Sequence, residues 1–225
     1  MIQRKVKRRF DPLLDDPVNE LLPGDRGQME PPYDGVAELW WSSREVLLEA
    51  YSAAEAIEAA EELVEDEKKF VDLKRSPGWC CYEVPQINPT PENIVATEKS
   101  PLVKYYYPFN HNPQQSLEEA QFYWRVNHGP KVRQFGPAVR ALRYIQAHRL
   151  DDELNDLFKE ARGTEVPPYC GHAELWFDRA FISEAFATPE GAAALAALIE
   201  DEKHFIDFSR SSMWLAKEHV VIDRI

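Results

Sequence analysis

One stretch of this sequence occurs twice. Residues 33–41 read YDGVAELWW, and residues 169–177 read YCGHAELWF. The offset of 136 residues holds without a gap from residue 14 to residue 41, and 15 of these 28 aligned residues are identical. The match resumes at an offset of 135, where residues 65–72 align with 200–207 and Trp79 aligns with Trp214. The period is too long for a solenoid, so the sequence predicts two related units.

The repeat also predicts the domain boundaries. We expect an N-terminal unit at 1–87, a proline-containing linker at 88–101 and a complete C-terminal unit at 102–225. Far fewer residues precede the repeated stretch in the first unit than in the second, so the first unit lacks the opening strand and helix. Either the sequence starts at an internal methionine of a longer protein, or the first unit has an open edge.

Composition excludes several classes of partner. The chain has 225 residues, of which 44% are hydrophobic, and no apolar run approaches the roughly 20 residues that cross a bilayer. A net charge of −13 argues against nonspecific binding to nucleic acid or to a membrane, although residues 4–9 are basic. No secretory signal is recognisable, so we expect a cytoplasmic protein. Its three cysteines fit neither a zinc spacing nor a disulfide framework, and we interpret them as buried apolar residues.

The first unit is predicted to contain few helices and strands. Residues 1–10 are too charged for a central strand, which favours an edge strand or a disordered start. A long connection at 11–32 leads to a predicted strand at 36–41. Apolar residues at helical spacing predict a helix over 45–69, and a short strand follows at 79–84.

The second unit is predicted to contain more strands and helices than the first. Strand-like residues at 103–107 precede a capping box, Ser116 with Glu119, which predicts a helix running to about His128, where Gly129 and Pro130 stop it. Predicted strands at 141–148 and 172–177, a helix opened by Thr188, and a strand at 214–222 follow.

Strand-helix-strand-strand-helix-strand is the order of a ferredoxin-like, split βαβ unit. In such a unit, helices cover one face of a sheet, and the other face needs a covering layer. A second copy supplies it. We therefore predict an α+β fold in which two ferredoxin-like units form an intramolecular dimeric α+β barrel, with the helices outside. The protein would be a monomer acting as a pseudo-dimer, or a homodimer.

Strand alternation divides the candidate site residues between two faces. Ala173, Leu175 and Phe177 are apolar and suit the helix-covered side, so their neighbours His172, Glu174 and Trp176 should point into the barrel. On the preceding strand we expect a polar set to point inward as well, namely Tyr144, Gln146 and His148. Residues of the first and last strands, Tyr106 and His219 among them, complete the expected lining.

A cavity lined by tyrosine, histidine, glutamine, glutamate and tryptophan suits a planar phenolic or polyketide-like molecule. Aromatic walls bury its rings, and a histidine that is neutral near pH 7 can move its acidic protons. The candidate catalytic residues are His128, Tyr144, His148 and His172, and the candidate substrate-binding residues are Tyr106, Gln146, Glu174, Trp176 and His219. We expect no cofactor. The histidines lack a zinc-type spacing, and His148, His172 and Glu174 are the one constellation that could bind a metal.

Each candidate also has a structural interpretation. His128 can cap a helix end, and His148 with His172 can be a polar pair that fixes strand register. Glu38 and Glu174 recur in both units, which favours a shared structural hydrogen bond. The repeat partners of His148 and His172 are Pro12 and Val36. Only the second unit keeps these histidines, so we expect one active site per chain.

Three stretches of the second unit carry a resemblance to a known family. These are residues 122–132, with a helix that ends in His-x-Pro, residues 142–148, and residues 171–177 together with 205–207 and 218–219. They resemble the EthD family of the dimeric α+β barrel superfamily, over nearly all of the second unit and over about 10–87 of the first.

The resemblance implies cofactor-free chemistry on small aromatic or polyketide-like compounds, and it points to His128, Tyr144 and His148 as proton-transfer groups, with His172 as an addition. Our leading hypothesis is a cofactor-independent lyase or isomerase, of cyclase, dehydratase or decarboxylase type. One alternative is a cofactor-free oxygenase of a phenolic substrate. Another is an accessory protein that binds a small molecule without catalysis.

Overall fold

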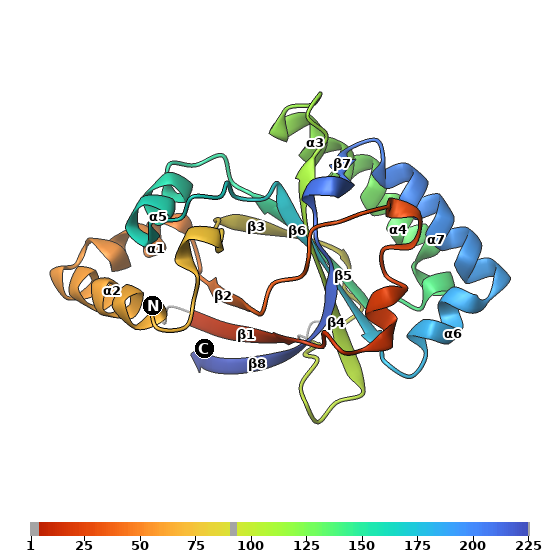
Figure 1. Cartoon of the computed structure of the whole chain (residues 1–225), viewed down its shortest axis with the longest axis horizontal. Helices are drawn as coiled ribbons and strands as arrows, with labels where there is room; N and C mark the ends of the chain where they lie inside the picture. Colours follow the sequence, from red (N-terminus) through yellow and green to blue (C-terminus); the bar gives the residue numbers. More distant parts are fainter. Residues whose placement is uncertain (1–4, 91–93, 225) are drawn as a thin grey trace.

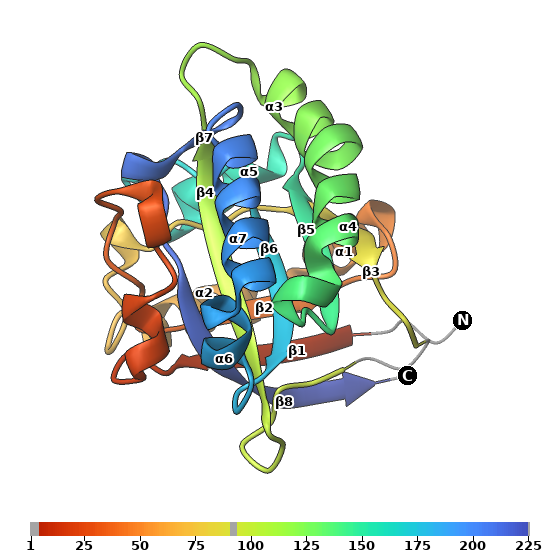
Figure 2. The ribbon, with the colours of Figure 1, turned by 90° about the vertical axis from the view of Figure 1, so that its right-hand side faces the viewer.

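A single curled antiparallel sheet organises the structure, a computed structural model that describes residues 5–90 and 94–224 (Figures 1 and 2). The strands follow the order β2-β1-β8-β4-β6-β5-β3, and a two-stranded extension pairs β7 with β4. Their bounds are β1 Lys5–Pro12, β2 Val36–Trp40, β3 Cys81–Ile87, β4 Leu102–His111, β5 Arg143–Arg149, β6 Gly171–Asp178, β7 Ile206–Asp207 and β8 Trp214–Arg224.

Helices lie outside this sheet in two groups. In the second half, helices cover the outer face of β4, β6 and β5, as Figure 2 shows face-on; they are α3 Leu117–Tyr123, α4 Gly129–Val139, α6 Ile182–Ala187 and α7 Pro189–Glu202. A second group gathers at the opposite end of the molecule in Figure 1, formed by α1 Arg44–Ser52, α2 Ala54–Glu67 and α5 Leu154–Arg162. Among the described residues, no helix is both long and apolar enough to cross a membrane.

Strands of both halves share the one sheet. The second half contributes the central order β8-β4-β6-β5, while β1 pairs with β8 and β3 pairs with β5. The ends of the series are therefore β2 and β3. The described strands form a curled sheet that is open between these two strands, so the expected barrel is present only in part.

The main core lies between this sheet and the helices of the second half. Side chains alternate along β4, so Tyr105, Tyr107 and Phe109 face the helices. On β6, Ala173 and Phe177 do the same, as the alternation predicted. The predicted helix cap at Thr188 is confirmed, because its side chain accepts a hydrogen bond from the Gly191 N–H.

The prediction of an edge strand or disorder over residues 1–10 is wrong for the described residues. Strand β1 lies between β2 and β8 and pairs with both. Alternation explains how a charged strand occupies an interior position: Phe10 is fully buried on one face, while Arg9 lies exposed on the other and pairs with Asp11. Residues 1–4 of this prediction lie outside the described part.

Two helix boundaries also differ from the predictions. The capping box at Ser116 and Glu119 is present, but the helix does not stop at Gly129. It passes through a π-helical turn, η4 Trp124–His128, and continues as α4 to Val139. Pro130 stands in the first turn of α4, directly after the π-helical turn. The helix expected over 45–69 is two helices, which meet at Ala53.

Candidate functional site

The sheet separates the predicted site residues into two groups. Strands β5 and β6 pair with Ala147 opposite His172 and Gln146 opposite Ala173, and directly paired residues share a face. His172 and Glu174 therefore face the inside of the curled sheet, as predicted. The inward prediction for Tyr144, Gln146 and His148 is wrong, because this register places them on the helix-covered face. A shift of one residue in register reverses every side chain of a strand, and the polarity pattern of β5 alone did not specify it.

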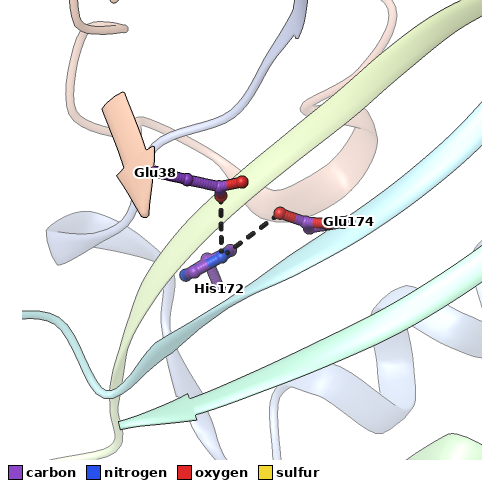
Figure 3. A group of neighbouring side chains, drawn as sticks. All are labelled: Glu38, His172 and Glu174. Carbon is purple, nitrogen blue, oxygen red and sulfur yellow. Dashed lines mark ion pairs between the residues drawn. The ribbon is translucent and has the colours of Figure 1, made fainter. Parts of the chain in front are cut away.

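The inward group is a buried cluster of charges (Figure 3). His172 Nε2 lies 3.3 Å from Glu38 Oε1 and 3.3 Å from Glu174 Oε1. Lys104, which is fully buried, places its Nζ 2.7 Å from Glu174 Oε1 and 3.5 Å from Glu38 Oε2. The Tyr106 ring stacks on His172 with the ring centroids 4.7 Å apart. Carboxylates from both halves thus meet one ammonium and one imidazole.

The cluster shifts the pKa of its members in opposite directions. Burial, reinforced by the negative charge of Glu174, raises the pKa of Glu38. Burial would also raise the pKa of Glu174, but Lys104 and His172 outweigh it and lower that pKa. Burial lowers the pKa of His172, whereas hydrogen bonds to Glu174 and Glu38 outweigh burial and raise it to about 9. His172 is therefore held as a cation, which is unsuited to removing protons near pH 7.

The same residues are the metal-type donor group found in the described part of the chain. Donor atoms of Glu38, His172 and Glu174 lie within 4.8 Å of one another and could hold a metal ion. This set differs from the predicted constellation, because Glu38 takes the place of His148. The Lys104 ammonium already supplies positive charge to both carboxylates, so the geometry fits a structural ion-pair cluster.

Two further predicted residues form hydrogen bonds or ion pairs with acidic side chains. Trp176 faces inward, and its Nε1 donates a hydrogen bond of 2.7 Å to Glu218 Oε2. His219 is on the opposite face of β8, with Nε2 3.0 Å from Asp11 Oδ2. Neither residue lines the helix-covered cavity that is described below, and a substrate-binding role for them stays a prediction.

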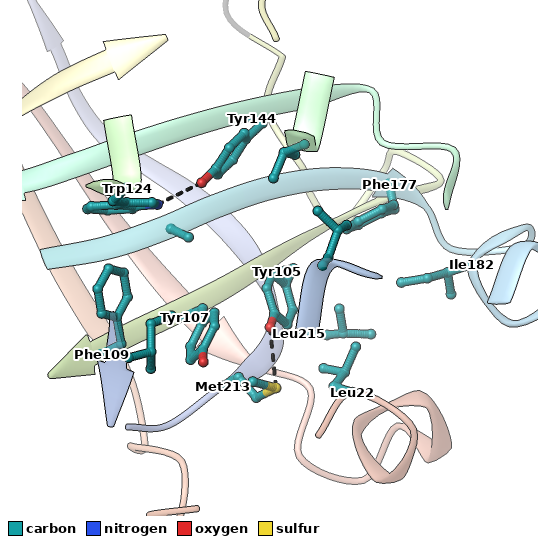
Figure 4. Close-up of a cluster of buried hydrophobic side chains, with 14 of the residues drawn as sticks. Leu22, Tyr105, Tyr107, Phe109, Trp124, Tyr144, Phe177, Ile182, Met213 and Leu215 are labelled. Carbon is teal, nitrogen blue, oxygen red and sulfur yellow. Dashed lines mark hydrogen bonds between the residues drawn. The ribbon is translucent and has the colours of Figure 1, made fainter. Parts of the chain in front are cut away.

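A second group lies between the sheet and the helices of the second half, where Figure 4 shows a cluster of buried hydrophobic side chains. It surrounds a cavity of about 70 Å³. Its wall is mostly aromatic and aliphatic, with a few polar groups. The lining residues that could form hydrogen bonds or transfer protons are Arg26, Tyr105, Tyr107, Trp124, His128, Tyr144 and Glu202. An apolar pocket with a small number of polar groups is the usual form of a small-molecule site.

The π-helical turn places two of these residues together. Trp124 and His128 are its first and last residues, and both are buried and line the cavity. Single π-turns within α-helices often occur at functional sites. The sequence predicted His128, whereas the π-turn left no recognisable signal.

His128 is held by a carboxylate. Its Nδ1 lies 2.8 Å from Asp201 Oδ2, and Asp201 also accepts hydrogen bonds from Tyr123 and Lys131. Burial would raise the pKa of Asp201, but these hydrogen bonds, that of His128 first, outweigh it and lower the pKa. An ionised Asp201 favours a proton on Nδ1, which distinguishes this nitrogen from Nε2, and His128 lines the cavity. Sequence reasoning missed Asp201, although it lies in the repeated segment 200–207.

Tyr144 is oriented by donors. Trp124 Nε1 donates to its hydroxyl oxygen over 2.8 Å, and Gln146 Nε2 donates over 3.1 Å (Figure 4). Because both partners donate, the proton of Tyr144 is free to donate elsewhere, and the residue lines the cavity. Burial raises the pKa of Tyr144, so it remains protonated near pH 7.

His148 supports this arrangement from behind. Its Nε2 lies 3.1 Å from Gln146 Oε1. Its ring is fully buried, and the ring centroids of Trp124 and Tyr82 lie 4.2 and 5.3 Å from its own. Burial, with the charges of Arg125 and His172, lowers the pKa of His148 to about 3. A neutral ring that donates from Nε2 fixes the Gln146 amide so that it donates to Tyr144. His148 does not line the cavity.

A buried ion pair closes another part of the cavity. Arg26, from the 3₁₀ turn η2 Gly24–Arg26 of the first half, donates to Glu202 from Nε at 2.6 Å and from Nη2 at 2.7 Å. Paired, two-pronged contacts of this kind fix geometry as well as charge. Sequence reasoning missed both residues, because nothing in a sequence shows that a loop of one half meets a helix of the other.

Comparisons with known proteins agree with the fold. A family model described as EthD domain matches residues 2–74 and 112–209. A solved structure named as an anthrone oxidase-like protein superposes with a TM-score of 0.51 at 13% identity, covering 100% of this chain and 93% of the other. A candidate monooxygenase from Lactobacillus acidophilus NCFM gives a TM-score of 0.41 at 8% identity, covering 99% of this chain and 100% of the other. No curated protein matches.

Proposed function

The chain belongs to the EthD domain family, and from that premise we propose that its helix-covered cavity binds a planar phenolic or polyketide-like compound and removes a proton from it. The observation that carries the proposal is His128, whose Nδ1 is bound to Asp201 while its ring lines an aromatic cavity. This pair has the arrangement of a general base with an orienting carboxylate.

The first step would be proton transfer to His128 Nε2. The ionised Asp201 stabilises the imidazolium that forms, since its carboxylate lies 2.8 Å from the other ring nitrogen. A phenol or an acidic carbon next to an aromatic ring suits such a base. The product of this step is a phenolate or a carbanion whose charge spreads over the rings.

Tyr144 would stabilise the negative charge that develops on a ligand oxygen. Its hydroxyl oxygen already accepts from Trp124 and Gln146, so its own proton can be donated to that oxygen. One such preorganised donor contributes about 3 kcal/mol to stabilising a transition state. Gln146 and His148 would act as positioning residues.

Oxidation is the first candidate for the fate of the carbanion. The structural relative named as anthrone oxidase-like supports it, as does the mostly apolar lining, which would protect a carbanion from water. A ring methylene that has lost a proton to His128 reacts with O₂ to give a peroxide anion, which takes that proton back to form a hydroperoxide. The hydroperoxide then loses water to leave a carbonyl. One O₂ is consumed and one water is released for each methylene oxidised.

The same base supports lyase or isomerase chemistry when the carbanion eliminates a group or is reprotonated elsewhere. This second candidate needs no oxygen. An accessory protein that only binds the ligand would use the cavity without proton transfer.

The size of the cavity limits the ligand. Ligand pockets commonly measure roughly 300–1,000 Å³, and this cavity has about 70 Å³. A compound with several rings therefore requires lining side chains, such as Phe186 and Leu195, to move outward.

The test is turnover of anthrone and of simple phenols, followed by oxygen uptake and by mass spectrometry of the products. We expect His128→Ala to lower turnover by about 100-fold or more, while His219→Ala, which lies outside the cavity, leaves it unchanged. Turnover without oxygen uptake selects the lyase or isomerase reaction. Normal turnover by His128→Ala contradicts the role of His128, and saturable binding without turnover by the unmodified protein selects the accessory role.

We also propose that the two halves arose by duplication of a ferredoxin-like unit. The order β8-β4-β6-β5 and the pairing of β1 and β3 on its two flanks support this interpretation, together with the sequence repeat. The described part of the first copy would then correspond to β1, β2 and β3.

A further inference from the structure

A second hollow, which the proposed chemistry does not use, lies beside the connection 13–35 between β1 and β2. It has a volume of about 240 Å³, and we call it the outer groove. The residues that line it include Leu14, Pro23, Met29, Glu30 and Met213. Most of its lining is apolar, so it suits a hydrophobic group.

The outer groove is separated from the helix-covered cavity by a single layer of residues at two points. Leu22 lines the cavity, and Pro23, the next residue along the chain, lines the groove. Tyr105 lines the cavity, and its hydroxyl group donates a hydrogen bond of 3.3 Å to Sδ of Met213, which lines the groove (Figure 4). The two spaces are therefore neighbours.

The contact between Tyr105 and Met213 is the part of this partition that can open at little cost. A thioether sulfur is a weak acceptor, so the Tyr105 hydroxyl group loses little when it donates to a ligand oxygen instead. Methionine has an unbranched, flexible side chain that adapts to irregular gaps in a core. Movement of these two side chains would join the cavity to the groove.

The connection 13–35 is itself tied to the second half. Arg179 donates two hydrogen bonds to Asp16, over 2.5 and 2.6 Å, and Arg26 donates two to Glu202. Both contacts are two-pronged, so they fix the geometry of the connection. The groove is thus a preformed space, and its opening toward the cavity depends on side chains.

The combined volume of the two spaces fits a ligand that the cavity alone does not hold. The helix-covered cavity has about 70 Å³, whereas ligand pockets commonly measure roughly 300–1,000 Å³. The cavity and the outer groove together reach the lower end of that range.

Glu30 gives the outer groove its charge. Its carboxylate accepts a hydrogen bond of 2.6 Å from Tyr169, and no basic side chain belongs to the groove lining in the described part of the chain. A ligand group with a negative charge would therefore meet the Glu30 carboxylate without a counterion, which is unfavourable.

We propose that the outer groove is a second compartment of the ligand site, which holds the neutral, apolar end of an elongated phenol. The proposal rests on the proposed function for the other end of the ligand, whose phenol ring lies in the helix-covered cavity beside His128 and Tyr144. Between the two ends, the ligand passes through the space that Tyr105 and Met213 vacate. The substrate class is thus a phenolic ring that bears an alkyl chain or a further ring without an acidic group.

Binding of 4-alkylphenols tests this assignment independently of turnover. Isothermal titration calorimetry would compare phenol, 4-propylphenol and 4-hexylphenol with the full chain. Burial of each added methylene should raise the affinity by about fourfold. An affinity that does not rise with chain length, or no binding of any of these phenols, overturns the proposal.

Two leucines of the same connection locate the alkyl chain. Leu14 lines the groove and is 46% exposed, whereas Leu21 is 49% exposed and does not belong to the lining. Leu14→Asp should weaken binding of 4-hexylphenol by about tenfold or more and leave binding of phenol unchanged, while Leu21→Asp should alter neither. Equal effects of the two variants overturn the assignment.

The role of Glu30 has a separate test. A carboxylate at the end of the chain, as in 6-(4-hydroxyphenyl)hexanoate, should weaken binding about tenfold or more relative to 4-hexylphenol. Glu30→Gln should narrow this difference between the two ligands. An unchanged difference in the variant overturns the selection against acids.

Methionine signals report on the groove directly, since Met29 and Met213, two of the three methionines in the chain, line it. In a protein with ¹³C-labelled methionine methyl groups, 4-hexylphenol should shift the signals of both residues, whereas phenol should leave that of Met29 unchanged. Unshifted signals with 4-hexylphenol place its chain elsewhere and overturn the proposal.

These outcomes are distinguishable from a failure of the proposed function. An affinity that rises with chain length, in a protein that turns over no phenol, supports the groove and contradicts the catalytic role of His128. Turnover of phenol without any effect of chain length on affinity supports His128 and overturns the groove.

Discussion

The hydroxyl groups of Tyr33 and Tyr169, which the repeat aligns with each other, lie 3.2 Å apart. Each ring also packs near a tryptophan of the other half, and these two tryptophans, Trp79 and Trp214, are aligned by the repeat. The ring centroids of Tyr33 and Trp214 are 6.1 Å apart, and those of Tyr169 and Trp79 are 5.5 Å apart. The two halves therefore meet through the same residues in exchanged roles. Such an exchange is what the proposed duplication would produce at a pseudo-twofold interface within one chain.

The two tyrosines should contribute unequally to stability. Tyr169 also donates a hydrogen bond of 2.6 Å to Glu30, so Tyr169→Phe leaves a partly buried carboxylate without its donor. We expect it to lower the free energy of unfolding by about 1.5–3 kcal/mol, and Tyr33→Phe to lower it by about 1 kcal/mol. Urea denaturation of both variants measures the difference. Equal losses would show that the hydrogen bond to Glu30 contributes nothing.

Asp201→Asn should impair catalysis without removing the base. The amide cannot stabilise an imidazolium, and its NH₂ group can donate to His128 and favour the wrong tautomer. We expect kcat to fall by about 100-fold or more, with binding of the ligand retained. The readout is the pH profile of kcat beside a direct binding titration. A normal kcat would contradict an orienting role for Asp201.

The lowered pKa of His148 leads us to expect that the protein loses stability in mild acid. When unfolded, the residue takes up a proton below its ordinary pKa of 6.5, whereas the folded residue stays neutral until pH falls to about 3. The unfolded state binds more protons in this window, so the free energy of unfolding decreases as the pH falls from 6.5 toward 3. His148→Gln should flatten that dependence. Thermal unfolding across this pH range checks it, and an unchanged slope in the variant would assign the dependence to other groups.

Lys104→Met should be strongly destabilising. It removes the ammonium that lies 2.7 Å from Glu174 and leaves buried carboxylates uncompensated. Breaking a buried pair by removing one partner typically costs about 3–5 kcal/mol. Adding Glu174→Gln to the same protein should recover part of the loss, and a double-mutant cycle by chemical denaturation measures the coupling. Additive losses would mean that the two groups do not interact.

Residue patterns predicted much of the second half. Period-two alternation placed Ala173 and Phe177 under the helices, and His172 and Glu174 on the inner face, because apolar and polar residues alternate along β6. The capping box at Ser116 was recognisable because its two hydrogen bonds are local. The same reasoning failed on β5, because Tyr144, Gln146 and His148 lie on the helix-covered face, where hydrogen bonds with one another and with Trp124 satisfy their polar groups.

The sequence by itself determined that the chain is a repeat, that it has the α+β type of the EthD family, and that His128 and Tyr144 are candidates for chemistry. Repeats, periodicity and caps depend on neighbours along the chain. The tertiary structure decided which candidates share a cavity, because that depends on strand register and on contacts between distant segments. The tertiary structure placed Asp201 beside His128, and it placed His172 in a separate ion-pair cluster. In the described residues it also left the sheet open between β2 and β3.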